Sequence, residues 1–181
     1  NEREQFGKAI INFPQVYEML ANMRAKTDAI RTLLYETTRC VDMYKSLEAI
    51  SRERKLENEE RTTLKTYSRL ADAFTPLLKL FSSEYANQIT YDCIQVHGGS
   101  GFMKDYACER FYRDARILTI YEGTSQLQVV AAIRGVVSGA YVARIKEYEA
   151  IEVRDELKPL RQTLISLRES FEQCYEKVKE F

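Results

Sequence analysis

The chain has 181 residues, of which 45% are hydrophobic and 30% charged, a balance typical of a globular protein with its own core. Its 27 basic and 27 acidic side chains cancel, so composition gives no reason to expect nucleic acid or an anionic membrane surface as the main partner. With only 7 Gly and 3 Pro, it lacks the turn residues of an all-β protein. No apolar run is long enough for a membrane span, and no signal peptide is visible.

The first two predicted helices are long. Apolar residues recur at helical spacing from about residue 13 to about residue 45, with Asn12 as a candidate cap and Pro14 in the first turn. The charged run SRERKLENEER, residues 51–61, predicts a solvated connection or an exposed helix end. A second helical region covers about residues 62–96, and Pro76 should break or kink it near Thr75.

The glycine cluster HGGSG, residues 97–101, predicts a turn after the second helix. A helix precedes it, so it does not match the strand–loop–helix of dinucleotide-binding folds. A tight turn between helices and a set of backbone N–H donors for a phosphate both remain open. Residues 105–116 then predict a short charged helix.

The last third of the chain predicts further helices. Ser125 and Gln128 match a capping box, so a helix should start near Ser125 and continue past Gly135 and Gly139. Apolar residues alternate in steps of three and four from Leu157 to the C-terminus, which is a heptad pattern. This tail either packs on its own domain or forms a coiled coil with another subunit. The pattern as a whole predicts an all-α fold of long helices in an antiparallel bundle.

The four cysteines and the single histidine give no metal motif. Cys40, Cys93, Cys108 and Cys174 lie far apart and form no C-x-x-C pair, so we expect reduced thiols in a reducing compartment. His97 has no Cys or His neighbour at a recognised ligand spacing, so we expect no metal site.

One acid, Glu122, stands between Tyr121 and Gly123 and close to Ile117, Leu118 and Ile120. An acid just before a helix is common, because the helix N-terminus carries partial positive charge. Alternatively, apolar surroundings would raise the pKa of the carboxyl group and suit it to act as a general base.

Four motifs together resemble the C-terminal domain of the acyl-CoA dehydrogenases over about residues 3–135. They are R-x-Q-F-G at residues 3–7, Q-x-x-G-G-x-G at 95–101, E-R-x-x-R-D-A-R at 109–116 and I-Y-E-G-T at 120–124. The resemblance implies a four-helix bundle at residues 1–136, and the tail, residues 137–181, would be an added helical extension. Because the chain starts at NEREQFG without Met, we expect it to be part of a longer chain.

The family oxidises acyl-CoA thioesters to trans-2-enoyl-CoA with FAD and passes electrons to an electron-transfer flavoprotein. The resemblance therefore implies an acyl-CoA substrate, that electron acceptor and a homo-oligomer, either tetramer or dimer, in a bacterial cytoplasm or a mitochondrial matrix. An acyl-CoA oxidase and a non-catalytic helical oligomerisation domain are the alternatives. The isolated chain would lack the β domain that holds the other side of the flavin and would be inactive.

The resemblance also implies roles for individual residues. Glu122 would be the catalytic base, and Tyr121 and Gly123 would flank the acyl chain. The positions implied to contact the FAD of the same subunit are Thr124 and Gln126, and those implied to contact the FAD of a neighbouring subunit are Arg3, Gln5, Gln95, Gly98 and Gly99. Pro14 departs from the pattern, since it stands where many members carry a glutamine that contacts adenine.

Overall fold

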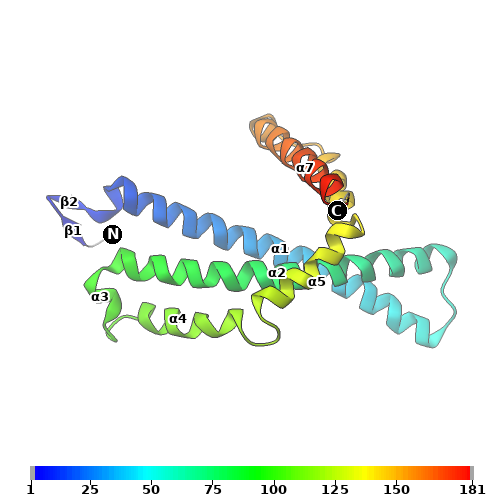
Figure 1. The fold of residues 1–181 in the computed structure, drawn as a ribbon, viewed down its shortest axis with the longest axis horizontal. Coiled ribbons are helices and arrows are strands. Elements are labelled where there is room, and N and C mark those ends of the chain that lie inside the picture. Colours follow the sequence, from blue (N-terminus) through cyan, green and yellow to red (C-terminus); the bar gives the residue numbers. More distant parts are fainter. Residues whose placement is uncertain (1–2, 180–181) are drawn as a thin grey trace.

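The computed structural model describes residues 3–179 (Figure 1). Its helices are α1 Pro14–Glu53, α2 Asn58–His97, α3 Gly99–Phe102, α4 Cys108–Ala115, α5 Ser125–Val137, α6 Ala140–Glu149 and α7 Lys158–Lys179. Three short 3₁₀ helices are η1 Ile10–Asn12, η2 Arg116–Thr119 and η3 Asp155–Leu157. A two-stranded antiparallel ladder, β1 Glu4–Gln5 with β2 Lys8–Ala9, precedes them. The expected all-α class is confirmed, with this hairpin as a small addition.

The long helices α1 and α2 form an antiparallel pair that runs the length of the molecule (Figure 1). The connection between them lies in the charged run, where Arg54 forms an ion pair with Glu60 at 2.6 Å. Glu57 and Glu60 form a reciprocal capping box that starts α2. Leu56 is buried here, so the charged run supplies an apolar anchor as well as a solvated turn.

Helix α2 is the central element, because α1, α4 and α5 all pack against it. The buried cluster consists of Cys40 from α1 with Leu70, Ala71 and Phe74 from α2. Tyr141 of α6 closes this cluster: its ring lies 5.7 Å from that of Phe74 and its hydroxyl donates to the carbonyl of Ala73 at 2.7 Å.

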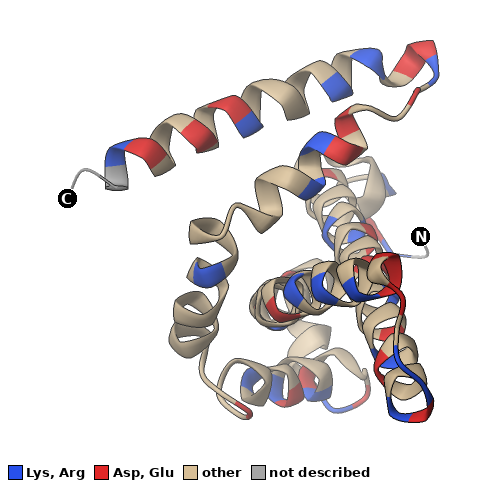
Figure 2. Ribbon diagram, turned by 90° about the vertical axis from the view of Figure 1, so that its right-hand side faces the viewer, with Lys and Arg blue, Asp and Glu red and all other residues tan. Residues whose placement is uncertain are grey.

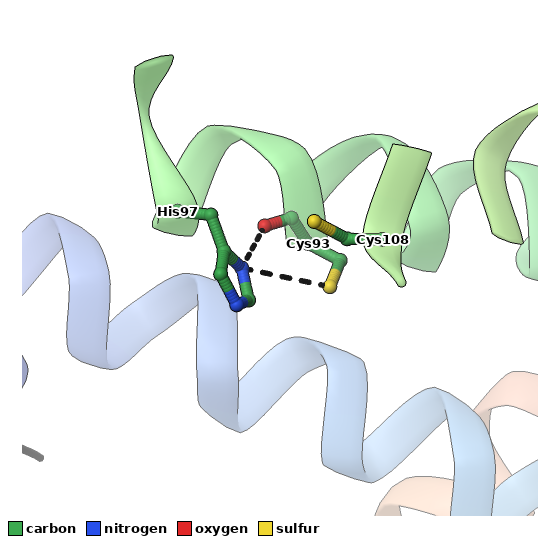
Figure 3. A group of neighbouring side chains, drawn as sticks. All are labelled: Cys93, His97 and Cys108. Carbon is green, nitrogen blue, oxygen red and sulfur yellow. Dashed lines mark hydrogen bonds between the residues drawn. The ribbon is translucent and has the colours of Figure 1, made fainter. Parts of the chain in front are cut away.

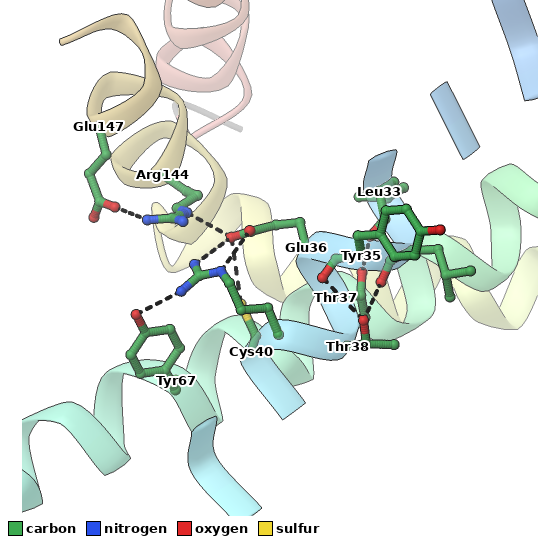
Figure 4. A network of polar contacts seen from close by, with 11 residues as sticks. Leu33, Tyr35, Glu36, Thr37, Thr38, Cys40, Tyr67, Arg144 and Glu147 are labelled. Atoms are coloured by element: carbon green, nitrogen blue, oxygen red, sulfur yellow. Dashed lines mark hydrogen bonds and ion pairs between the residues drawn. The ribbon is translucent and has the colours of Figure 1, made fainter. Parts of the chain in front are cut away.

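A polar network joins α6 to the same region (Figure 4). Glu36 of α1 accepts hydrogen bonds from Arg39 at 2.9 Å and from Arg144 of α6 at 2.8 Å, and Arg39 also donates to the hydroxyl of Tyr67 of α2. Burial on its own would raise the pKa of Glu36, but the hydrogen bonds from the two arginines lower it to about 2. The network therefore connects three helices through one ionised carboxylate.

Three local expectations were wrong. Helix α2 runs unbroken through Pro76, which is buried. An internal proline costs roughly 3 kcal/mol, and the packing of α2 on α1 and α5 outweighs this cost. Phe13, and not Asn12, is the N-cap of α1, with Pro14 at the first helical position. The helix near Ser125 does start there, but Thr124 is its N-cap and it ends at Val137, before Gly139, whose φ of +72° ends the run.

The tail helix α7 packs on α6 and stands apart from the α1–α2 pair (Figure 1). Arg168 holds it to α6 through an ion pair with Glu149 at 2.8 Å, and Lys146 pairs with Glu172 at 2.7 Å. Acidic and basic residues alternate along its surface (Figure 2). The heptad residues Leu160 and Leu167 are 67% and 63% exposed, so the described chain does not cover the seam. The last seam residues, Val178 and Phe181, lie outside the described side chains.

Across the described residues, no helix on its own has both the length and the hydropathy of a membrane span; the pair α5 and α6, bent by 65°, meets those two criteria only when taken together.

Candidate functional site

A tight turn between η2 and α5 carries Glu122. Its backbone has a φ of +52°, and Gly123 follows with a φ of +96°. A positive φ is unfavourable for a residue with a side chain, and such strain concentrates at functional sites. Among the described residues, Glu122 and Phe6 are the two non-glycine residues with this conformation. The I-Y-E-G-T motif is therefore a place where the chain holds a strained geometry.

Two side chains from neighbouring helices hold this turn in place. Lys79 of α2 donates to the carbonyl of Gly123 at 2.7 Å and to that of Leu118 at 2.9 Å, and its ammonium lies 5.7 Å from the ring centre of Tyr121. Gln128 of α5 donates to the carbonyl of Glu122 at 3.2 Å. The carbonyl groups of the turn thus point into the protein, toward Lys79 and Gln128.

The functional groups of Glu122 itself are free. Within residues 3–179, neither its carboxylate nor its backbone N–H makes a hydrogen bond or an ion pair. The expectation that apolar neighbours bury the carboxylate is wrong for the described residues, because Glu122 is exposed and its neighbours Ile117 and Ile120 are 52% and 47% exposed. These side chains share an outer surface that the described residues leave open.

A pocket of about 440 Å³ lies next to this turn, between α1, α2 and η2. Tyr121 and Leu118 form one side of it, and Lys79 lines it as well. The rest of its lining comes from α1 and α2: Thr27, Ile30, Ser82, Ser83, Ala86, Ile89 and Thr90. The exposed surface of the lining is mainly apolar. The pocket can therefore hold an apolar chain whose outer end lies next to Glu122.

The other residues predicted around Glu122 lie at the start of α5. Thr124 is the N-cap, but its side chain makes no capping bond, and Gln126 is exposed in the first turn. Ser125, between them, points the other way and donates a short hydrogen bond to Glu84 of α2. Thr124 and Gln126 therefore keep polar groups available beside the open face.

A second group of predicted residues lies at the far end of α2. Arg3 donates to the carbonyl of His97 at 2.6 Å, and its guanidinium would be 3.1 Å from a Cβ placed on Gly98, whose φ is +62°. The structure thus brings the first motif against the glycine turn. Gln5 in β1, Gln95 and Gly99 are exposed at this end.

The two groups do not form one site within a single chain. Eighteen residues of α2 separate Lys79, which holds the Glu122 turn, from His97, which Arg3 contacts. At 1.5 Å per residue this is about 27 Å along the helix. The roles predicted for the two groups, one toward the cofactor of the same subunit and one toward that of a neighbour, stay predictions.

One expectation about His97 was wrong. Cys93 lies one helical turn before it, and Cys108 at the start of α4 lies beside both, so it does have cysteine neighbours (Figure 3). The i, i+4 spacing of Cys93 and His97 is visible in the sequence, but the third residue arrives only through the fold. Burial, together with the nearby Cys108, raises the pKa of the Cys93 thiol.

The sequence also left unnoticed the residues that support the Glu122 turn. Lys79 and Glu84 stand 43 and 38 residues before it with no motif around them, and Gln128 was noticed only as the partner of Ser125 in a capping box. A lysine and a glutamate on the half-buried face of α2 were the available signal, because buried charges in a bundle are usually paired.

The chain matches two family models. Residues 1–136 match the acyl-CoA dehydrogenase C-terminal domain, and residues 137–181 match a model described as acyl-CoA dehydrogenase C terminal. The chain therefore belongs to the acyl-CoA dehydrogenase family, of which it carries the C-terminal helical domain.

Named relatives include both reductases and dehydrogenases. The chain is 35% identical over 127 residues to the caffeyl-CoA reductase-Etf complex subunit CarC of Acetobacterium woodii, and this match covers 70% of the chain and 27% of that protein. It is 32% identical over 139 residues to cyclohexane-1-carbonyl-CoA dehydrogenase of Geobacter metallireducens, covering 77% of the chain and 30% of that protein.

A solved structure of an acyl-CoA dehydrogenase complexed with FAD, from Bacillus anthracis, matches with a TM-score of 0.59 and 32% identity. The match covers 80% of this chain and 24% of that one. The chain thus spans less than a third of each of these three proteins.

Proposed function

We propose that this chain supplies the catalytic base of a flavin-dependent acyl-CoA dehydrogenase, and that Glu122 is that base. It removes the α-proton of an acyl-CoA thioester as the thioester becomes trans-2-enoyl-CoA. The free carboxylate on its strained, clamped turn is the observation that carries this proposal, together with membership of the family.

The turn gives Glu122 two functions in the reaction. Its carboxylate takes the proton from the α-carbon, and the C–H electron pair moves toward the thioester carbonyl. Its unpartnered backbone N–H donates to that carbonyl oxygen and stabilises the negative charge that develops there. Lys79 and Gln128 fix the carbonyls on the inner side of the turn, so the N–H does not reorient during the reaction.

The exposure of Glu122 fits a base whose surroundings are completed by another part of the protein. An open, apolar surface formed by Ile117, Ile120 and Tyr121 surrounds it. When a second domain and the substrate cover this surface, water leaves the site, and the charge and hydrogen-bond interactions made there become stronger.

The pocket beside Tyr121 is the proposed place of the acyl chain. It begins next to the Glu122 turn and continues between α1 and α2, where small and aliphatic side chains such as Ala86 and Ile89 line it. Its volume of about 440 Å³ is in the range of small-ligand sites. Tyr121 and Gly123 then contact the acyl chain close to the reacting carbons.

FAD is the proposed cofactor, and the residues present fit its groups. Thr124 and Gln126 offer polar groups on the exposed start of α5, and Arg3 beside the side-chain-free Gly98 offers a cation where a pyrophosphate of a neighbour's cofactor can approach. FAD, when bound, accepts the hydride from the β-carbon. Gln5, Gln95 and Gly99 are the further proposed contacts of that neighbouring cofactor.

The proposed partners follow from the relatives. One of them is a subunit of a complex that its name associates with Etf, so an electron-transfer flavoprotein is the proposed electron partner. Because some relatives are named as reductases, we also propose the opposite direction for the same site, in which Glu122 gives a proton to the α-carbon. The protein is proposed to act as a homo-oligomer, because Arg3 and the glycine turn lie about 27 Å from the Glu122 site of the same chain.

The experiment uses the full-length protein that carries these residues. It is mixed anaerobically with a panel of acyl-CoA thioesters of different chain length, and bleaching of the oxidised flavin is recorded. Wild type should bleach with at least one thioester, Glu122→Gln should not, and the matched change Glu18→Gln on the exposed face of α1 should behave as wild type. Equal bleaching of wild type and Glu122→Gln would remove Glu122 from the role of base.

Two alternatives give different results in the same preparation. An acyl-CoA oxidase would consume oxygen stoichiometrically with thioester and would not need an electron-transfer flavoprotein. A non-catalytic oligomerisation domain would leave every thioester unchanged. The isolated 181-residue chain is expected to bind FAD weakly and to lack activity, because Glu122 is exposed in it and one face of the site is uncovered.

A further inference from the structure

Cys93, His97 and Cys108 place one sulfur, one nitrogen and one sulfur within 4.8 Å of one another (Figure 3). Two thiols and an imidazole are the ligands that Zn²⁺ prefers, and tetrahedral zinc needs them about 3.5–3.8 Å apart. The Sγ of Cys93 already lies 3.8 Å from Nδ1 of His97. We infer that these three residues form a binding site for one Zn²⁺ ion at the end of α2. Neither the proposed base nor the proposed flavin contacts include this cluster.

The fold brings the third ligand to the other two by a specific route. Cys93 and His97 share one face of the last turns of α2, and the chain then folds back through the glycine turn to begin α4 at Cys108. Gly101 permits this reversal, because a Cβ there would lie 2.8 Å from both the His97 Cβ and the Ile94 carbonyl oxygen. The Sγ of Cys108 ends 3.4 Å from the carbonyl of Gly101. The cluster is therefore fixed by backbone geometry on both sides.

With Zn²⁺ bound, the site would carry no net charge, which suits its partly buried position. Two thiolates and one neutral imidazole around Zn²⁺ give no net charge, so a half-buried cluster needs no carboxylate to balance it. Cys108 is only 3% exposed, and Cys93 and His97 are partly buried. In the metal-free protein the groups make weaker contacts, such as the hydrogen bond from Nδ1 to the carbonyl of Cys93 at 2.7 Å. Zn²⁺ replaces that bond and the protons on both thiols.

The fourth coordination position can be filled from solvent. His97 and Tyr106 line a pocket of about 480 Å³ between η1, α1 and the end of α2. Of the three ligands only His97 lines this pocket, so a water ligand would reach the ion from the histidine side. The bound ion then links the end of α2 to the start of α4 and fixes the glycine turn between them.

The test uses the full-length protein, reduced and stripped of metal with a chelator. Zn²⁺ is titrated against a chromophoric chelator, and Co²⁺ is added separately to detect thiolate-to-cobalt charge transfer. Wild type should bind one Zn²⁺ per chain and show the cobalt band. Cys93→Ser, His97→Gln and Cys108→Ser should each weaken binding at least about 100-fold, more than loss of an outer-shell partner. The control is Cys174→Ser, at an exposed position of α7, which should bind as wild type.

Three results would overturn the inference. They are a wild type that binds no Zn²⁺ and gives no cobalt band, equal loss in Cys174→Ser, and a Cys93–Cys108 disulfide in the isolated protein that persists without metal. Circular dichroism checks that each variant is folded. If Cys108→Ser fails to fold, His97→Gln and the wild-type cobalt spectrum still decide the question, because the histidine is half-buried and its ring can be replaced without emptying the core.

Discussion

The ammonium of Lys79 donates a 2.7 Å hydrogen bond to the carbonyl oxygen of Gly123, so the middle of α2 holds the turn directly after Glu122. The same ammonium reaches the carbonyl of Leu118 at 2.9 Å. The carbonyls of Leu118 and Gly123 thus each receive a hydrogen bond from the same ammonium group and not from a backbone N–H group. Lys79 reaches them from the inner side of the turn, away from the open face where Glu122 lies.

Lys79→Met should separate positioning from chemistry. The methionine keeps the aliphatic volume but leaves two partly buried carbonyls without their charged donor, at a cost of about 2–3 kcal/mol in the free energy of unfolding. The proposed dehydrogenation should slow about 10- to 100-fold, with kcat affected more than KM, because the base is displaced while the acyl pocket remains. Stopped-flow flavin reduction and thermal unfolding measure the two effects.

Lys65→Met is the matched control, since Lys65 is exposed on the same helix. It should leave both the flavin reduction rate and the unfolding free energy near their wild-type values. Equal rates for Lys79→Met and wild type would show that the turn keeps its geometry without the lysine.

Gly123→Ala should impair the same step for a different reason. The residue has a φ of +96°, which costs an alanine about 1–2 kcal/mol, and its Cβ would lie 2.7 Å from Nε2 of Gln128. We expect Glu122 to move and the rate of flavin reduction to fall about 100-fold. The double change Gly123→Ala/Gln128→Ala removes the collision and keeps the backbone strain. If it recovers the full rate, the collision alone was responsible and the positive φ is dispensable.

The helices were predictable from the sequence because their apolar periodicity is strong, and the order of the four motifs indicated the family. Three kinds of feature were not predictable. Pro76 lies inside an unbroken helix, since the packing energy that overrides a proline comes from α1 and α5, distant in sequence. Glu122 is exposed although its sequence neighbours are apolar, because local hydrophobicity does not say which surface the fold covers. Lys79 and Cys108 join their sites only through tertiary contacts.

Glu36 should make the free energy of unfolding depend on pH in the acidic range. Its pKa of about 2 in the folded protein lies below the ordinary value of 4.5, so its ionised form stabilises the fold above about pH 4.5, and this contribution is lost as the pH falls toward 2. Glu36→Gln removes it, at a cost of at most about 3 kcal/mol near neutral pH. Chemical unfolding from neutral pH to about pH 2 should show the wild-type advantage over the variant shrinking throughout the lower window. An advantage that stays constant across that window would contradict the assignment.

The exposed seam of α7 leads to the last prediction. Leu160 and Leu167 are 67% and 63% exposed in a helix that packs mainly on α6, so the option that this seam packs on its own bundle has no support among the described residues. An apolar heptad stripe left open in this way is best covered by the same stripe of a second copy. Leu160→Asp/Leu167→Asp should therefore lower the mass of the full-length oligomer in light scattering after size-exclusion chromatography. Gln162→Asp, at an exposed polar position of the same helix, should leave the mass unchanged, and an unchanged mass in the double leucine variant would remove α7 from the assembly interface.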